Sequence, residues 1–180
     1  EASKVYIVNS LTLSSGIAFL ILQACDMRKR GYDAEAIVKA SQTLISKVNV
    51  SFVAKNADYL AINGRVSSLI AKFVRSFRLH PVFYMDNGKL TVLRFEHGNR
   101  EKYIKKYIRR QFKQKDKIDT ERVFITHAAC AKDEVDRIVA EVRSIIDFKN
   151  IHICTTSASV ACNCGAGAVG VIYKYKDSCR

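Results

Sequence analysis

A run of small residues near the end of the chain has a composition that suits an anion-binding turn. Residues 162–173 read Cys-Asn-Cys-Gly-Ala-Gly-Ala-Val-Gly-Val-Ile-Tyr, so glycine and alanine precede an apolar, strand-like segment. Glycine allows positive φ and close approach of a ligand, and successive N–H groups in such a turn can hold an anion. The run lacks the Lys-Ser/Thr pair of a phosphate loop and the spacing of a dinucleotide fingerprint. By itself it favours a tight turn into a buried strand, with the anion site as the alternative.

An arginine beside a predicted helix start is the second candidate. Asn63-Gly64 predicts a turn, Arg65 follows it, and Ser67 is typical of a residue that caps a helix. A guanidinium can bind two carboxylate or phosphate oxygens while the helix N–H groups add their dipole. These residues alone favour the alternative, which is an ordinary surface arginine.

The remaining polar residues indicate no catalytic or metal site. His127 and His152 fall in separate predicted strands without an acidic partner at catalytic spacing, which favours structural histidines. Cys162 and Cys164 are spaced C-x-C rather than C-x-x-C, and no second pair with metal-ligand spacing follows. The sequence therefore predicts no metal, no cofactor and no catalytic residue. It also predicts that the six cysteines are reduced thiols of a cytoplasmic protein.

Length and composition suit one globular domain, or one domain with part of another, in 180 residues. Hydrophobic residues make up 48% of the chain, which argues against disorder. No apolar run approaches the roughly 20 residues of a membrane span. The first residues carry no secretion-signal pattern, and we expect the chain to start partway into a longer one. The formal net charge of +13 predicts an anionic partner, or else a surface that is merely well solvated.

The first third of the chain predicts a strand and two helices. An apolar run over residues 4–8 predicts a buried strand. A serine, Ser14 or Ser15, then caps a helix that stops at Gly31, and Asp33 caps a second helix. Apolar residues recur at helical spacing in the first of these helices, among them a cysteine predicted to lie in the core: Ile17, Leu20, Ile21, Ala24 and Cys25.

The rest of the chain alternates predicted strands and helices. Asp86-Asn87-Gly88 lies between two strand-like runs, which is a strong hairpin signal. A further helix begins near Asp133. The other predicted strands are residues 48–54, 123–128, 150–155 and 169–175, the third of which contains Cys154, a second predicted core cysteine.

A strongly basic amphipathic helix is predicted from Asn99 to about Lys113. Its apolar stripe should face the core: Tyr103, Ile104, Tyr107, Ile108 and Phe112. Its basic side could dock an acidic partner or nucleic acid. We favour a solvated helix face, because the aromatic residues fit the buried stripe rather than a stacking platform.

Four segments, in order along nearly the whole chain, resemble the DegV family of lipid-binding proteins. Residues 8–17, V-N-S-L-T-L-S-S-G-I, are similar to the family's V-I-D-S-x-x-x-S-x-G-L. Residues 58–67, D-Y-L-A-I-N-G-R-V-S, are similar to E-Y-L-x-x-G-G-R-I-S. Residues 163–170, N-C-G-A-G-A-V-G, are similar to H-T-G-P-G-A-L-G, and residues 79–82, L-H-P-V, to I-K-P-I.

The resemblance implies an α/β protein of two domains. Residues 1–48 would be the end of a three-layer α/β domain, a strand and two helices. Residues 49–180 would form a two-layer α/β domain with a mixed six-stranded sheet. The resemblance also implies a binding protein rather than an enzyme. Such a protein holds a long-chain fatty acid in an apolar tunnel and presents its carboxylate to a partner fatty-acid kinase.

The resemblance also implies the ligand-binding residues. Arg65 matches the family's arginine near the carboxylate, and Asn163 stands where the family has histidine, followed by Cys164 and Gly165. An imidazolium can neutralise a carboxylate, whereas an amide donates only a neutral hydrogen bond. A diverged scaffold or interaction module without a ligand is therefore the alternative function. A basic nucleic-acid-binding domain is less favoured.

Overall fold

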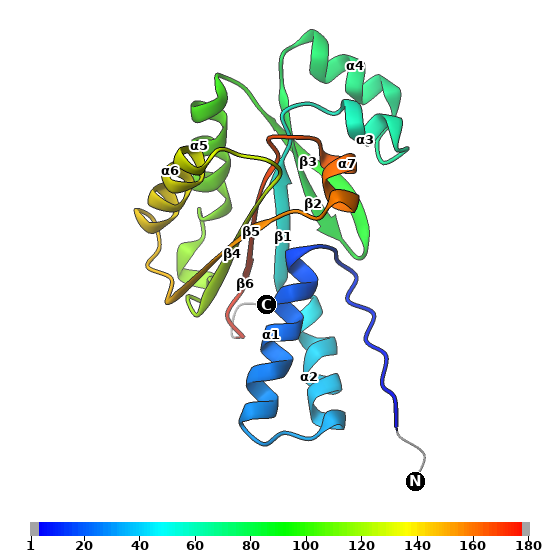
Figure 1. The fold of residues 1–180 in the computed structure, drawn as a ribbon, viewed down its shortest axis with the longest axis vertical. Coiled ribbons are helices and arrows are strands. Elements are labelled where there is room, and N and C mark those ends of the chain that lie inside the picture. Colours follow the sequence, from blue (N-terminus) through cyan, green and yellow to red (C-terminus); the bar gives the residue numbers. More distant parts are fainter. Residues whose placement is uncertain (1–3, 178–180) are drawn as a thin grey trace.

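The computed structural model describes residues 4–177, which form a six-stranded sheet with helices on both faces (Figure 1). The strand order is β3-β2-β1-β6-β4-β5. β4 and β5 run parallel, and the other neighbouring pairs in this sheet run antiparallel. The mixed sheet confirms the predicted fold class. Its strands are β1 Val48–Val53, β2 His80–Asp86, β3 Lys89–Glu96, β4 Arg122–His127, β5 Asn150–Thr155 and β6 Val169–Lys174.

The helices fall into three groups around the sheet. α5 and α6 cover one face, α1 covers part of the opposite face with α2 beside it, and α3, α4 and α7 lie together at one end (Figure 1). A short 3-10 turn, Lys115–Lys117, follows α5. The bounds are α1 Ser15–Lys29, α2 Ala34–Ile45, α3 Asp58–Ile62, α4 Ser68–Ser76, α5 Arg100–Gln111, α6 Lys132–Arg143 and α7 Ala158–Cys164.

The largest core lies between the sheet and the basic helix α5. All five apolar residues of the predicted stripe are buried, which confirms the predicted facing of this helix. Tyr107 is fully buried, and its hydroxyl donates to the Ser51 carbonyl and accepts from the Val171 N–H, both at 2.9 Å. Burial raises the pKa of Tyr107 well above its usual value, so the phenol stays neutral.

Local signals predicted the Asp33 and Ser67 caps and the hairpin correctly, whereas Ser14, which precedes α1, makes no side-chain capping hydrogen bond. The Asp33 carboxylate accepts from the Ala36 N–H at 2.8 Å at the start of α2. Ser67 caps α4 in the same way. In the β2–β3 hairpin the two turn residues, Asn87 and Gly88, have φ of 46° and 81°. Both values are positive, as a tight turn between twisted antiparallel strands requires.

The predicted strand over residues 4–8 is wrong. Residues 4–10 join no strand in the described part of the chain, and Val5 and Ile7 are 83% and 87% exposed. This segment runs away from the sheet (Figure 1). A strand requires a neighbour for its N–H and C=O groups, and an apolar run alone does not supply one.

The predicted facing of α1 is only partly correct. Leu20 is buried as expected, but Ile17 and Ile21 are 41% and 56% exposed, and Phe19 instead packs on Phe124 of the sheet. α1 is apolar on several sides, so periodicity does not select one face. The predicted core position of Cys25 is wrong because that residue is exposed on α1.

The other cysteines follow the sequence more closely. Cys154 is half-buried, and the five cysteines within residues 4–177 are free thiols, while Cys179 lies outside the described residues. No group of three or more His, Cys, Asp or Glu side chains in that range is placed to hold a metal ion. None of the helices in the same range combines the length and apolar composition needed to cross a bilayer.

Candidate functional site

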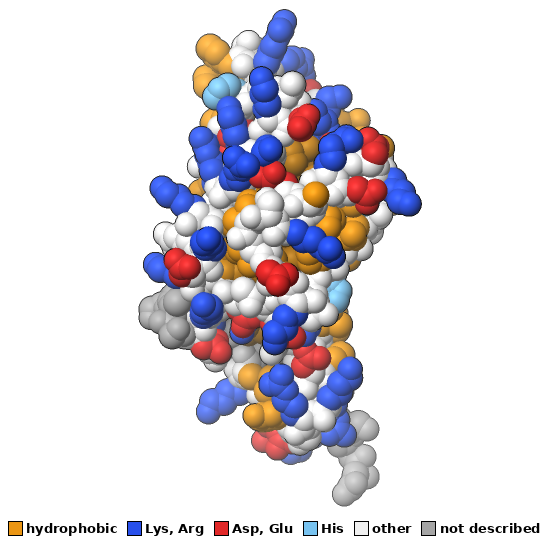
Figure 2. All heavy atoms as spheres, turned by 90° about the vertical axis from the view of Figure 1, so that its left-hand side faces the viewer, with side chains coloured by type: hydrophobic (Ala, Val, Ile, Leu, Met, Phe, Trp, Pro, Cys, Tyr) orange, Lys and Arg blue, Asp and Glu red, His pale blue; other side chains and the backbone are white. Residues whose placement is uncertain are grey.

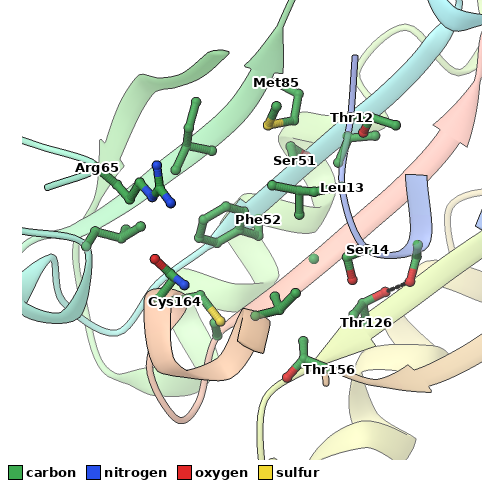
Figure 3. A pocket seen from close by; sticks show the side chains of 18 of the residues that line it. Thr12, Leu13, Ser14, Ser51, Phe52, Arg65, Met85, Thr126, Thr156 and Cys164 are labelled. Atoms are coloured by element: carbon green, nitrogen blue, oxygen red, sulfur yellow. Dashed lines mark hydrogen bonds between the residues drawn. The ribbon is translucent and has the colours of Figure 1, made fainter. Parts of the chain in front are cut away.

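A cavity of about 590 Å³ opens on the sheet face opposite α5 and α6 (Figure 3). Strand residues alternate between the two faces. Val171 therefore packs towards α5 and α6, whereas Val50 and Ile172 point to the other face and line the cavity. The volume is within the usual range for small-molecule sites.

The middle of the cavity is apolar. Phe52 of β1 lies at its centre and stacks on Phe83 with ring centroids 5.1 Å apart. Leu13, Met85 and Leu90 extend this lining from the segment before α1 and from the hairpin. Such a surface suits a hydrocarbon chain.

Arg65 and α7 meet at one end of the cavity. Figure 3 shows the Arg65 side chain on the same side as Cys164. The Asn63 amide links the two segments, because it donates to the Cys162 carbonyl at 3.0 Å. The structure thus brings together three of the four predicted site residues, Arg65, Asn163 and Cys164, in one lining.

The glycine-rich run begins inside helix α7, which sequence analysis missed. Gly165 ends the helix with a φ of 78°, and its N–H donates to the Ala161 carbonyl at 2.8 Å. The Gly167 N–H donates to the Ala128 carbonyl at 2.6 Å. Both N–H groups already donate within the protein, which favours the tight turn over the anion-binding alternative.

Gly165 has a packing role rather than a place in the lining. A Cβ at this position would lie 2.6 Å from the ring of Tyr59 on α3. Glycine therefore allows α3 and α7 to approach each other, which fixes the end of the cavity where Arg65 lies.

The Asn163 side-chain amide uses its donor within α7. Its Nδ2 donates to the Ser159 carbonyl at 2.9 Å, one turn earlier in α7. Its Oδ1 is shielded from solvent and has no hydrogen-bond partner among the residues that the structure describes. The free group is thus an acceptor and not the expected donor.

Neither the nearby thiol nor the strand histidines have the features of catalytic groups. Burial raises the pKa of Cys164, so its thiol stays protonated. His152 stacks on Phe124 at 4.7 Å, and burial, followed by the charge of Arg122, lowers its pKa. His127 accepts from the Cys130 N–H at 3.4 Å. These histidines have packing and hydrogen-bonding roles, as predicted.

The other end of the cavity is lined by hydroxyl groups that sequence analysis did not single out. Five residues from three segments contribute them, and we call them the hydroxyl end: Thr12, Ser14, Ser15, Thr126 and Thr156. They lie across Phe52 from Arg65 (Figure 3). Sequence analysis considered Ser14 and Ser15 only as helix caps, and the fold brings residues around 12, 126 and 156 together.

A family model described as "Uncharacterised protein, DegV family" matches residues 1–176. The chain belongs to the DegV family. A DegV domain-containing protein of Clostridium acetobutylicum is 21% identical over 178 residues, which are 99% of this chain and 61% of that protein. The chain thus spans 61% of the length of that curated relative.

Two solved DegV structures have the same fold. A DegV family protein from Eubacterium eligens loaded with heptadecanoic acid has a TM-score of 0.85 at 16% identity, over 97% of this chain and 62% of that one. The Streptococcus pneumoniae Fatty Acid Kinase (Fak) B3 protein loaded with linoleic acid has a TM-score of 0.83 at 21% identity. That match covers 96% of this chain and 60% of the other.

Three of the four segments that resemble DegV sequences contribute to the lining of this cavity. They contribute residues 12–15, residues 60, 64 and 65, and residues 163, 164, 168 and 170. The fourth, residues 79–82, leads into β2 at the start of the hairpin. The family-like residues are therefore gathered around a site, although they are far apart in the sequence.

Proposed function

We propose that this protein binds a long-chain fatty acid in the cavity, with the carboxylate at Arg65 and the acyl chain along Phe52. The observation that carries the proposal is a guanidinium beside an apolar cavity of suitable size. An arginine can hold both carboxylate oxygens, and the apolar lining removes methylene groups from water. Two related structures loaded with fatty acids support the same ligand class.

The remaining features of the proposal follow from the family resemblance. Binding rather than catalysis is the proposed activity, and a fatty-acid kinase is the proposed partner for the bound carboxylate. Residues 1–48 would belong to a first domain and residues 49–180 to a second. A cytoplasmic location stays a prediction. These proposals concern the whole protein. This chain matches 61% of the length of the Clostridium acetobutylicum relative.

A nucleic-acid role has less support. Figure 2 shows the side that carries α5 and α6, where Lys and Arg side chains are widely spread with Asp and Glu among them. Several of the charges on α5 are paired: Arg100 contacts Glu134 at 2.5 Å and Arg110 contacts Glu96 at 2.9 Å. The aromatic residues of α5 are buried, so they offer no stacking surface.

Lipid that accompanies the purified protein tests the function directly. We expect mass spectrometry of an organic extract of the full encoded protein to detect long-chain fatty acid near equimolar amounts. If delipidated protein neither contains nor takes up added fatty acid, the scaffold without a ligand is the better description. A mock purification from cells without the protein controls for carried-over lipid.

Asn163 stands where the family has histidine, so we expect Asn163→His to gain affinity for fatty acid in a pH-dependent way. A histidine here would titrate near pH 6.5, or higher beside a carboxylate, and only its protonated form adds a charge. The gain is therefore present below that pKa and is lost as pH rises through it. For each protein the affinity at pH 6 is divided by the affinity at pH 8. We expect this ratio to be roughly three- to tenfold larger for Asn163→His than for the parent.

Binding isotherms of the parent, Asn163→His and Asn163→Gln at both pH values provide the measurement. The neutral glutamine variant controls for side-chain size. The same pH ratio in all three proteins would mean that position 163 does not face the ligand head group.

A further inference from the structure

One arginine of the basic helix, Arg100, contacts the turn that leads from α7 to β6. Arg100 is the first residue of α5, which covers the sheet face opposite the cavity. Its Nη1 donates to the Gly167 carbonyl at 2.8 Å. The turn comprises residues 165–168, and Cys164 before it and Ala168 at its end both line the cavity. Arg100 therefore contacts a segment that also forms part of the cavity wall.

The same guanidinium has three further partners. Nη1 also donates to the Tyr103 hydroxyl at 2.5 Å, Nη2 donates to Cys130 Sγ at 3.3 Å, and Nε pairs with Glu134 Oε1 at 2.5 Å. Burial raises the pKa of Cys130 to about 11, so its thiol is neutral and Glu134 supplies the negative charge. A planar guanidinium with several fixed partners has a defined orientation. The contact to Gly167 is thus held in one place.

The turn is also bonded to the segment that follows β4. The Gly167 N–H donates to the Ala128 carbonyl at 2.6 Å, and the Ala128 N–H donates to the Ala168 carbonyl at 2.9 Å. Ala128, Cys164 and Ala168 pack together in one buried cluster. Gly167 has a φ of 84°, and a Cβ there would lie 3.0 Å from Nη1, so glycine permits the approach of Arg100. A displacement of this turn would therefore also move Cys164 and the end of α7.

We propose that Arg100 is a positioning residue for the Arg65 end of the cavity, where it holds the turn at residues 165–168 and thereby keeps the end of α7 in place for the ligand carboxylate. The inference rests on the proposed function, since it takes the carboxylate to lie beside Arg65. Arg100 lies outside the cavity lining and acts only through the turn. A ligand that must first order a loosened segment binds more weakly, because ordering costs conformational entropy.

The thiol of Cys164 reports the position of α7 directly. Cys164 is 7% exposed, and burial raises its pKa, so a thiol reagent reacts with it only when the end of α7 opens. Cys162, two residues earlier, is exposed and is an internal reference. We expect Arg100→Met to raise the rate of Cys164 alkylation by a maleimide on the order of tenfold or more, without a change at Cys162. Peptide mass spectrometry assigns the label to each cysteine.

The affinity of the delipidated, full encoded protein for stearic acid is the second measurement. We expect Arg100→Met to bind roughly three- to tenfold more weakly than the parent. Arg109→Met is the matched control, because Arg109 also lies on α5 and pairs with Glu141 at 2.6 Å, with a side chain that is 60% exposed. Lys105 also pairs with Glu141, so this carboxylate keeps a partner in the control. The control should keep the parent affinity and the parent labelling rate.

Arg100→Lys separates positioning from general stability. It keeps a positive charge beside Glu134, but one ammonium group cannot reproduce the fork of contacts. It should therefore recover more of the melting temperature than of the affinity. If the Arg100 variants only melt at lower temperature, with parent labelling and affinity, this inference fails while the proposed function stands. Faster labelling without weaker binding also overturns it. If the parent binds no stearic acid, both proposals fail.

Discussion

We expect the Arg65→Ala variant to bind long-chain fatty acid roughly ten- to a hundredfold more weakly than the parent, because it loses a charge-assisted contact. In the proposed complex Arg65 supplies a formal positive charge to the carboxylate, and Asn163 cannot replace it because its free atom is an acceptor. The melting temperature should change little, since Arg65 is exposed in a loop.

A displacement assay with a fluorescent fatty acid measures the effect. Lys72→Ala is the matched control, because it removes a positive charge from the exposed side of the neighbouring helix α4. Similar weakening in both variants would indicate a general electrostatic effect. Unchanged affinity of Arg65→Ala would remove this residue from the site.

We expect the Tyr107→Ala variant to lose about 3–5 kcal/mol of unfolding free energy. The side chain is fully buried between α5 and the sheet, and its hydroxyl is bonded to backbone groups of both β1 and β6. Truncation leaves a cavity and also an unpaired N–H at Val171. For a chain of this length, we expect the melting temperature to fall by roughly 6–20 °C.

Two further variants separate packing from hydrogen bonding. Tyr107→Phe keeps the ring but leaves the Val171 N–H unpaired, and it should cost about 1–3 kcal/mol. Lys102→Ala, on the exposed side of α5, should leave the midpoint nearly unchanged. Denaturant unfolding measures all three, and a larger loss for Lys102→Ala than for Tyr107→Ala would reverse the assigned facing of the helix.

The elements that sequence analysis predicted correctly are those specified by local chemistry. The Asp33 and Ser67 caps, the Asn87-Gly88 turn and the stripe of α5 each depend on residues a few positions apart. Residues 4–8 were predicted wrongly because strand formation depends on a partner that an apolar run does not reveal. α7 was missed because small residues give weak periodicity and the glycines after it suggested a turn.

The candidate site was only partly predictable for the same physical reason. Arg65 and Asn163 were identified through the family resemblance, which compares positions and not local patterns. Thr12 and Thr156 carry no such signal, since they are ordinary polar residues until the fold brings them together. The acceptor role of Asn163 depends on a helix that was not predicted, because the Ser159 carbonyl determines which amide atom stays free.

The position of β6 has a consequence for how the chain folds during synthesis. β6 is the last of the six strands in sequence, yet it lies between β1 and β4 in the middle of the sheet. β1 and β4 therefore have no shared neighbour until residues 169–174 leave the ribosome, roughly ten seconds after β1 at usual translation rates. Until then both strands expose an unpaired edge that can join other chains, so a nascent chain arrested before β6 should depend on chaperones to stay unaggregated.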